Sequence, residues 1–370
     1  MNARKFTVTA VIWLVVVGLC SGIAQAAPIS KDKKEQKQPE KVFIPPQVKA
    51  VMQEGLATRQ GRQDIPFTII KNYVFPAAQN LHSVFLFKVK NSDLGFAPAA
   101  PAAPAAPAAQ PAAAQPPAAQ PPAGQTPPAP ALQAKVNIFL QFFQVENGVP
   151  GKLFHEVFVP GFFQEDAATY NPDKEEWYST GYPMPAGNYL MAMAITSPDL
   201  KKIGVVYYDI ALPNSASLQN TLETTPIIFV KKMEQMQAVE TRTEVHKGYF
   251  TYSVLQIVPN VECIVSQGQN IEILFYIFGT KLSADQKSAL EVSYEVKQGD
   301  KTAIRWANQN YDFALVSQPL PLKQTVLIKN DKGEHQETRD LAPGKYTLVI
   351  NITDKTGATK IAKTVDFEVQ

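Results

Sequence analysis

The chain is poor in cysteine and lacks every common catalytic motif. Cys20 lies in an apolar run at the N-terminus and Cys263 stands alone in the rest, so the folded part cannot rely on an internal disulfide. The alternation of Val261, Cys263 and Val265 predicts one strand face and a buried thiol. None of the four histidines is paired at metal-ligand spacing, and zinc, phosphate-loop, dinucleotide and nucleophile-elbow motifs are missing. We therefore predict a protein that is not an enzyme and has no catalytic, cofactor-binding or metal-binding residues.

An excess of charge of one sign is also absent. Removing the predicted N-terminal signal takes away Arg4 and Lys5 and no acid, which leaves 33 basic and 33 acidic side chains. A neutral chain has no electrostatic attraction for nucleic acid, so we expect no nucleic-acid partner. Residues 27–41 mix charges of both signs and predict a disordered charged leader.

The N-terminus has the pattern of a bacterial Sec-type signal peptide. A basic start precedes the apolar run "FTVTAVIWLVVVGL", and the small residues of "AQA" at 24–26 suit cleavage before Ala27. Residues 1–26 are therefore the predicted signal peptide, and the mature protein is expected to be periplasmic or secreted. Two alternatives stay open. An uncleaved segment would be the chain's one contact with the membrane, and a lipoprotein would begin at Cys20.

Most of the remaining sequence is typical of short strands separated by turns. Segments such as "HSVFLFKVK" (82–90) and "KYTLVINIT" (345–353) are rich in β-branched and aromatic residues. Turn signals such as "PAGN" and "APGK" lie between them. Helical patterns are confined to 46–60 and to 230–242, which is either a helix or a polar connector. This distribution predicts an all-β fold of two tandem immunoglobulin-like β-sandwiches.

An internal repeat supports two domains. "PAGNYLMAMAITSPDLKKIGVVYYDIAL" (185–212) aligns without a gap with "APGKYTLVINITDKTGATKIAKTVDFEV" (342–369), and a glycine, a tyrosine, a threonine and an aspartate coincide. Each segment is predicted to be the last hairpin of a sandwich, with the glycine in the turn before it. The predicted domains are therefore 42–230 and 249–370, joined by a connector at 231–248.

The composition changes abruptly at 97–131, where nearly every residue is alanine, proline or glutamine. The stretch between equivalent positions contains more residues in the first copy of the repeat than in the second. The excess is about the length of this run. We therefore predict a disordered Ala/Pro-rich loop inserted in domain 1, between strands 82–90 and 135–145. Lengthening a loop this much costs only on the order of 1 kcal/mol. The alternative is an interdomain linker that follows a small domain at 42–96.

Acidic and aromatic residues gather in "GFFQEDAATYNPDKEEWYSTGY" (161–182). The acids at 165–176 suit calcium in chemistry but match no known calcium loop, so calcium binding there is left open. The aromatic residues, with those of "AIRWANQNYDF" (303–313), are candidates for a platform that binds a sugar or peptide. The candidate platform residues are Trp177, Tyr178, Tyr182, Trp306 and Tyr311.

Both copies of the repeat share a pattern of proline, glycine, tyrosine, an alternating strand, a turn and a closing strand. The residues are "LAPGKYTLVINITDKTGATKIAKTVDFEV" (341–369), and "PMPAGNYLMAMAIT" with "YYDIALP" in the first copy. In these segments the chain resembles the tandem immunoglobulin-like sandwiches of exported bacterial proteins, in particular β-rich regions of the GWxTD-type family. The GWxTD motif itself is absent. The resemblance implies the sandwich fold and no known active site.

These patterns predict an exported, non-catalytic structural or protein-interaction protein of the cell envelope. Sheet edges or end loops would contact an envelope protein. The alternative is a glycan-binding β-sandwich module that holds a cell-wall glycan on the aromatic residues. If the protein is retained on cell-wall polysaccharide and the Trp177→Ala variant is not, the glycan-binding alternative is favoured.

Overall fold

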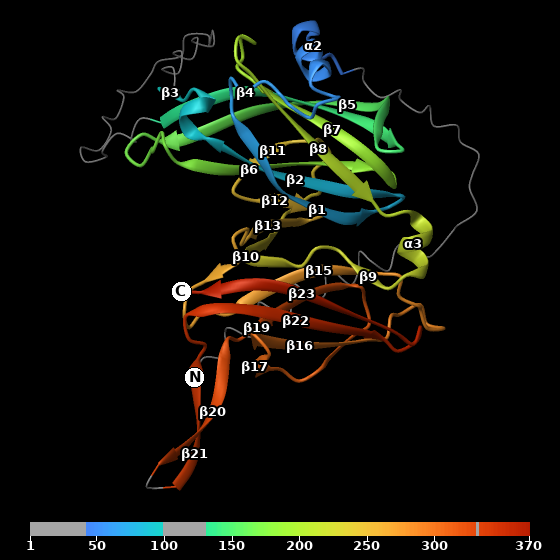
Figure 1. Ribbon diagram of the computed structural model, residues 1–370, viewed down its shortest axis with the longest axis vertical. Helices are drawn as coiled ribbons and strands as arrows, with labels where there is room; N and C mark the ends of the chain where they lie inside the picture. The colour runs from blue at the N-terminus through green and yellow to red at the C-terminus, as the bar shows by residue number, and fades with distance from the viewer. Residues whose placement is uncertain (1–41, 99–130, 331–332) are drawn as a thin grey trace, which may run out of the picture.

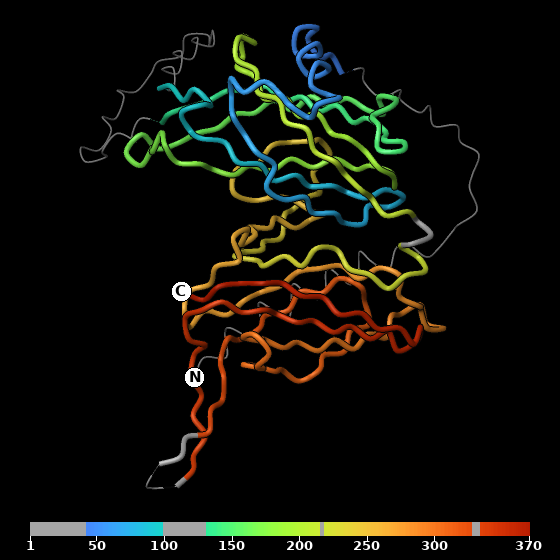
Figure 2. Tube along the Cα trace, viewed as in Figure 1, coloured from blue at the N-terminus to red at the C-terminus, as the bar shows by residue number. Residues whose placement is uncertain are grey.

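The computed structural model describes residues 42–98, 131–330 and 333–370, and its described residues form an all-β protein (Figure 1). The predicted all-β class is confirmed. The predicted signal peptide, the charged leader and residues 99–130 of the Ala/Pro-rich run lie outside the described residues. The path of the chain can be followed by colour in Figure 2.

In the described part of the chain four sheets stack along the long axis, and we number them I to IV from the end that carries helix α2 (Pro46–Glu54) (Figure 1). Pairing within them is antiparallel except between β14 (Ile264–Val265) and β23 (Thr359–Val369). Sheet I contains β3 (Ala97–Pro98), β4 (Ala131–Glu146), β5 (Val149–Asp166), β7 (Gly187–Thr196) and β8 (Ile203–Leu212). Sheet II contains β1 (Phe67–Ala77), β2 (Asn80–Lys90), β6 (Glu175–Met184) and β11 (Val245–Lys247).

Sheets III and IV form the other half, and a separate two-stranded hairpin extends from it. Sheet III contains β9 (Glu223–Thr224), β10 (Ile228–Gln235), β12 (Phe250–Tyr252), β13 (Leu255–Pro259), β15 (Ile271–Phe278) and β19 (Leu315–Leu320). Sheet IV contains β14 (Ile264–Val265), β16 (Leu290–Gln298), β17 (Lys301–Arg305), β18 (Gln309–Tyr311), β22 (Gly344–Asp354) and β23 (Thr359–Val369). The hairpin is β20 (Lys323–Asn330) with β21 (Gly333–Asp340). The described residues also form the short helices α2 (Pro46–Glu54), η2 (Asn91–Leu94) and α3 (Ser215–Asn220).

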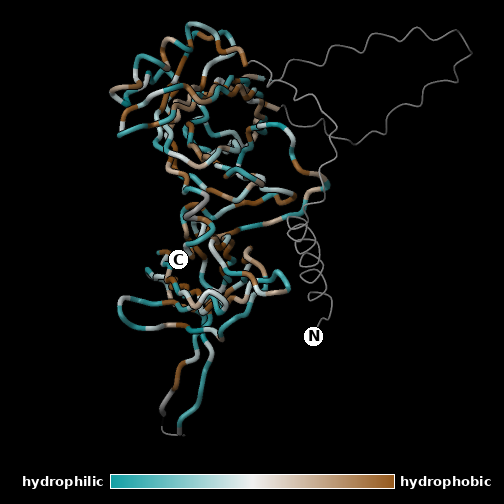
Figure 3. Tube along the Cα trace, turned by 90° about the vertical axis from the view of Figure 1, so that its right-hand side faces the viewer, coloured by the Kyte–Doolittle hydropathy of each residue, from teal (hydrophilic) through white to brown (hydrophobic). Residues whose placement is uncertain are grey.

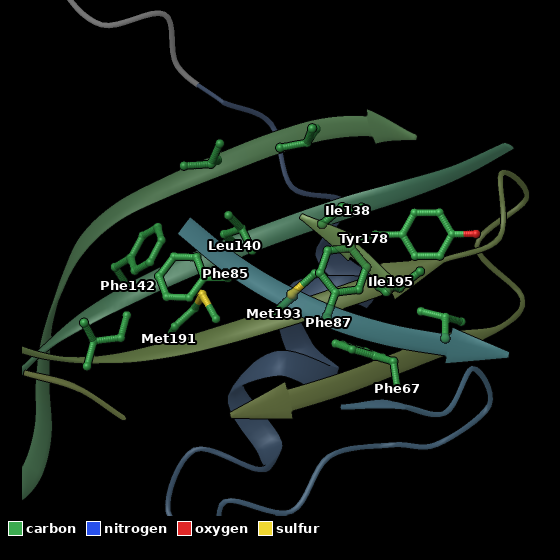
Figure 4. Close-up of a cluster of buried hydrophobic side chains, with 14 of the residues drawn as sticks. Phe67, Phe85, Phe87, Ile138, Leu140, Phe142, Tyr178, Met191, Met193 and Ile195 are labelled. Carbon is green, nitrogen blue, oxygen red and sulfur yellow. The ribbon is translucent and has the colours of Figure 1, made fainter. Parts of the chain in front are cut away.

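Sheets I and II enclose a core of aromatic, branched and methionine side chains (Figure 4). Phe85 and Phe87 alternate along β2 and point toward sheet I, where Phe142 lies 6.3 Å from the Phe85 ring. Met191 and Met193 of β7 fill the space between these rings. Alternation along each strand thus directs one row of side chains into this core.

Helix α2 covers the outer face of sheet I. Val48 and Met52 are fully buried there against the small side chains of Ala192 and Ala194 in β7. The hydroxyl of Tyr207 donates a hydrogen bond of 2.8 Å to the Met52 carbonyl near the end of the helix. The predicted helical pattern at 46–60 is therefore a helix over its first part. Its apolar face meets the sheet, which explains why β7 is apolar on both faces.

Sheets II and III pack face to face through a second apolar layer. Tyr73 and Phe75 of β1 meet Phe250 of β12, with ring centroids 5.5 and 5.8 Å apart. Val84 and Leu86 of β2 are buried in the same cluster. Sheet II is thus buried on both faces, and the two halves of the molecule share a continuous apolar contact.

The chain crosses this contact more than once. β10 pairs with β13 and β15 in sheet III, whereas β11 returns to pair with β6 in sheet II. The predicted boundary after residue 230 falls inside β10, and the predicted connector 231–248 includes most of β10 and all of β11. The segment at 230–242 is therefore not a helix; it begins as a strand and continues as an irregular chain.

Sheets III and IV enclose the core of the other half, and its last hairpin reproduces that of the first. Tyr189 pairs with Ile210 in β7–β8, and Tyr346 pairs with Phe367 in β22–β23. Each tyrosine hydroxyl donates a hydrogen bond to the carbonyl four residues earlier, at 3.1 Å for Tyr189 and 2.8 Å for Tyr346. The glycine two residues before each tyrosine has φ of +151° and +152° respectively. The sequence repeat is therefore also a repeat of register and hydrogen bonding.

The two described ends of the Ala/Pro-rich run lie side by side in sheet I. Ala97 pairs with Gln133 and Pro98 with Leu132, in an antiparallel β3–β4 ladder. β2 precedes this ladder in sheet II, which shares a core with sheet I. The run therefore leaves and re-enters the same half of the molecule, as an insertion does.

Cys263 does not lie in a strand with Val261 and Val265. It has φ of +54°, between β13 and β14, and its Sγ lies 3.7 Å from the Asn260 carbonyl oxygen. The side chain is half-buried, and burial raises the pKa of the thiol. The alternating pattern was misleading because a left-handed residue redirects the chain at this point.

We predict that Phe250→Ala destabilises the protein by about 3–5 kcal/mol, because it opens a cavity in the contact between sheets II and III. Urea unfolding followed by fluorescence and circular dichroism measures the change. Leu327→Ala is the control, since Leu327 is 63 % exposed and its loss should change stability by less than about 0.5 kcal/mol. Equal effects of the two substitutions would contradict a stabilising contact here.

Loss of either tyrosine hydroxyl should cost about 0.5–1.5 kcal/mol, the usual net value of one hydrogen bond. We expect this of Tyr189→Phe and Tyr346→Phe in chemical denaturation. Gly344→Ala should cost at least as much, because an alanine is strained at its positive φ. Gly151→Ala is the control, since Gly151 is not among the residues of positive φ and an added Cβ meets only one atom, at 3.4 Å. A Gly344→Ala variant as stable as that control would refute the strain argument.

Replacing residues 99–130 by Asn-Gly should leave a single cooperative unfolding transition, because Pro98 and Leu132 are already paired. The shorter loop should change the free energy of unfolding by no more than about 2 kcal/mol. Calorimetry of both chains measures it. Loss of cooperativity in the shortened chain would show that folding needs the run.

Candidate functional site

A cavity of about 620 Å³ opens at the margin of the contact between sheets II and III. One wall is sheet II, where the cavity meets His82 of β2 and Ser179 and Gly181 of β6. The other walls are the turn between β12 and β13 and the irregular chain that joins β10 to β11. Segments far apart in the sequence therefore meet here.

The sheet II wall carries two imidazoles because strand alternation directs both toward sheet III. His82 lies two residues before the interface residue Val84, and His246 of β11 pairs with Ser179. Gly181 gives His82 room, since a Cβ at that position would lie 2.6 Å from the His82 Nε2. Burial lowers the pKa of His82 and so favours the neutral imidazole. The nearby Glu240 carboxylate acts in the opposite direction, but its effect is smaller.

His246 is held tightly at the back of the cavity. Its side chain is 8 % exposed, and its ring stacks on Tyr249 with centroids 4.6 Å apart. Its Nε2 lies 3.0 Å from the Glu240 Oε2, and the Thr251 hydroxyl donates to the same oxygen at 2.8 Å. The Glu240 carboxylate is thereby positioned against one imidazole nitrogen.

Glu244 completes a cluster with the chemistry of a metal site. One carboxylate oxygen each from Glu240 and Glu244 and one ring nitrogen of His246 all lie within 4.8 Å of one another. Within residues 42–98, 131–330 and 333–370, no other group of three histidine, cysteine or acidic side chains converges in this way. These residues are the ones in the described chain that could hold a metal ion together.

Sequence reasoning missed this cluster because it looked for histidine paired with histidine or cysteine. The signal was local, since the two glutamates and His246 span seven residues of the predicted connector. Neither a helix nor a polar connector at 230–242 implies convergence of these side chains. The turn of the chain toward sheet II between β10 and β11 brings them together.

The candidate platform residues of β6 are largely covered. Trp177 is half-buried against the apolar layer between sheets II and III, whereas the adjacent Tyr178 is fully buried between sheets I and II. Tyr182 stacks on Phe142 and His155, with centroids 5.7 and 4.9 Å apart. Successive residues of a strand point to opposite faces, so Trp177 and Tyr178 do not share a surface.

The other two platform residues belong to the far half. Trp306 is half-buried against the core between sheets III and IV. Tyr311 is 5 % exposed, and its hydroxyl lies 2.9 Å from that of Tyr294 and donates to Gln318 at 2.7 Å. The structure thus distributes the five aromatic residues over three apolar layers and does not bring them together.

Three of the acidic residues at 165–176 form ion pairs with lysines. Lys247 contacts both Glu165 and Glu176, and Lys90 lies 2.7 Å from Asp173. The Lys90–Asp173 pair fastens the loop before β6 to sheet II, and Lys247 of β11 links β5 of sheet I to β6 of sheet II. Within the described chain, these acids do not form a group of three convergent ligands.

Hairpin β20–β21 is a second candidate region, because it projects from the rest of the molecule (Figures 1 and 3). Its eight residue pairs run from Lys323–Asp340 to Asn330–Gly333, and within the described residues its strands pair only with each other. Leu327 is 63 % exposed on it. The edge of β5 differs, since Pro150 and Pro160 interrupt its backbone donors.

Comparison with protein-family models found no matching family, and comparison with curated proteins found no significant match. In the described part of the chain, no helix has the length and apolar character needed to cross a membrane.

Proposed function

We propose that the chain is an exported, non-catalytic interaction protein of the cell envelope, built on two tandem immunoglobulin-like sandwiches. Sheets I and II would form one sandwich and sheets III and IV the other. The paired hydrogen bonds of Tyr189 and Tyr346 to the upstream backbone support this assignment, because such tyrosine corners accompany that fold. The signal pattern at 1–26 supports export to the periplasm or beyond.

The projecting hairpin β20–β21 is the observation that carries the interaction role. A two-stranded ribbon is marginally stable in water by itself, and each of its outer edges presents backbone N–H and C=O groups without a strand partner. An extended segment of another protein can satisfy these groups by adding a strand. Neither strand contains proline, so the backbone donors of both edges are available.

A protein partner is favoured over a glycan. Tyr178 and Tyr311 are buried, and Trp177 and Trp306 pack against different apolar layers, so no shared aromatic platform supports glycan binding. The hairpin instead offers backbone groups and mixed polar side chains, which suit an extended polypeptide. An envelope protein that adds a strand is therefore the proposed partner.

A photo-crosslinking residue at Thr338, which is exposed on β21, should trap a discrete protein in cells that produce the full chain. The same residue at Lys201, 83 % exposed between β7 and β8, is the matched control and should not trap it. Crosslinked bands are separated by size and identified by mass. Identical bands from both positions, or none from Thr338, would reject the hairpin as the binding element.

A second variant separates binding from folding. Replacing residues 324–339 by Asn-Gly joins Lys323 to Asp340, which are already paired. We expect an unchanged melting temperature and loss of the partner from pull-downs with the purified chain. Full retention of the partner by this folded variant would contradict the proposal.

A further inference from the structure

Two carboxylates converge in the cavity between sheets II and III, and Arg242 lines the same cavity without a recorded ion pair to either of them. The carboxylate oxygens of Glu240 and Glu244 lie within 4.8 Å of each other, where like charges repel. Among the described residues the one ion-pair partner recorded for either is His246, beside Glu240. Such an arrangement is favoured when a divalent cation binds between the groups.

The donor set indicates the class of cation. An imidazole nitrogen with two carboxylates suits zinc and its first-row neighbours better than calcium or magnesium, which prefer oxygen alone. The separation of 3.0 Å between His246 Nε2 and Glu240 Oε2 resembles the spacing of about 3.3 Å between ligands of a tetrahedral zinc ion. His82 of β2 lines the same cavity, which therefore contains a second imidazole.

The surroundings are those of a built site rather than of an acidic surface patch. His246 is more than nine-tenths buried and is held by the Tyr249 ring, while the Thr251 hydroxyl fixes Glu240. Glu244 is exposed and Glu240 is partly exposed, whereas His246 is buried. The cluster therefore combines a buried imidazole with two carboxylates that an entering ion can reach.

We propose that Glu240, Glu244 and His246 bind a divalent cation of the zinc class. The ion would fasten the chain between β10 and β11 to sheet II, at the margin of the contact that joins the two halves. It would thus stabilise the junction independently of the hairpin and its partner. The proposal does not rest on the interaction role, and either can fail alone.

Zinc titration of the full mature chain, without a polyhistidine tag and after dialysis against chelator, tests the site. Calorimetry should give one Zn²⁺ per chain, and the melting temperature should rise in proportion to occupancy. Glu244→Gln should weaken Zn²⁺ binding at least tenfold without lowering the zinc-free melting temperature, because this side chain is exposed and its charge opposes that of Glu240. Calcium at the same concentrations should not shift the melting temperature.

Glu234→Gln is the matched control, since Glu234 is half-exposed on β10 and lies outside the cluster. It should bind Zn²⁺ like the original chain. His246→Ala should also abolish tight binding, and Co²⁺ absorption spectra should report loss of the nitrogen ligand in variants that remain folded. The proposal is overturned if the original chain binds no Zn²⁺, if Glu244→Gln binds it as tightly, or if Ca²⁺ alone stabilises the chain.

Discussion

The apolar contact between sheets II and III is the interaction on which the rest of the structure depends. Rings from β1 and β12 meet across it, and side chains of β2, β10 and β13 extend the same layer. Because this layer buries the second face of sheet II, the two halves cannot behave as beads on a flexible linker. The chain between them also contributes a strand to each side, which adds backbone hydrogen bonds to the apolar contact.

The two candidate regions owe their character to their positions relative to this contact. The cavity with Glu240, Glu244 and His246 lies at its margin, where the chain turns from one sheet to the next and polar groups can be accommodated. The hairpin β20–β21 is far from this contact. It projects beyond sheet IV, away from the apolar cores (Figure 1). We propose that the first region stabilises the junction and that the second binds a partner.

Much of the fold was predictable because it depends on local patterns. Strand composition, turn residues and the repeat around Tyr189 and Tyr346 indicated an all-β chain with two equivalent hairpins, and α2 was visible as an apolar face. Comparing the two copies predicted that the Ala/Pro-rich run is an insertion, and the pairing of Pro98 with Leu132 brings its two described ends together. The pattern at Cys263 failed because one residue of positive φ breaks strand alternation, which no composition reveals.

The positions of most strands and turns follow from local sequence, since alternation and turn propensity act over a few residues. Which faces of the strands are covered depends on the tertiary fold. The unbroken apolar runs of β2 and β7 are compatible with burial on both sides, but their covering partners are distant in the chain. For the same reason the candidate aromatic platform was divided among separate cores, while two glutamates and a histidine met in a cavity. Side-chain convergence depends on how sheets stack, and stacking is set by contacts between residues that no local pattern connects.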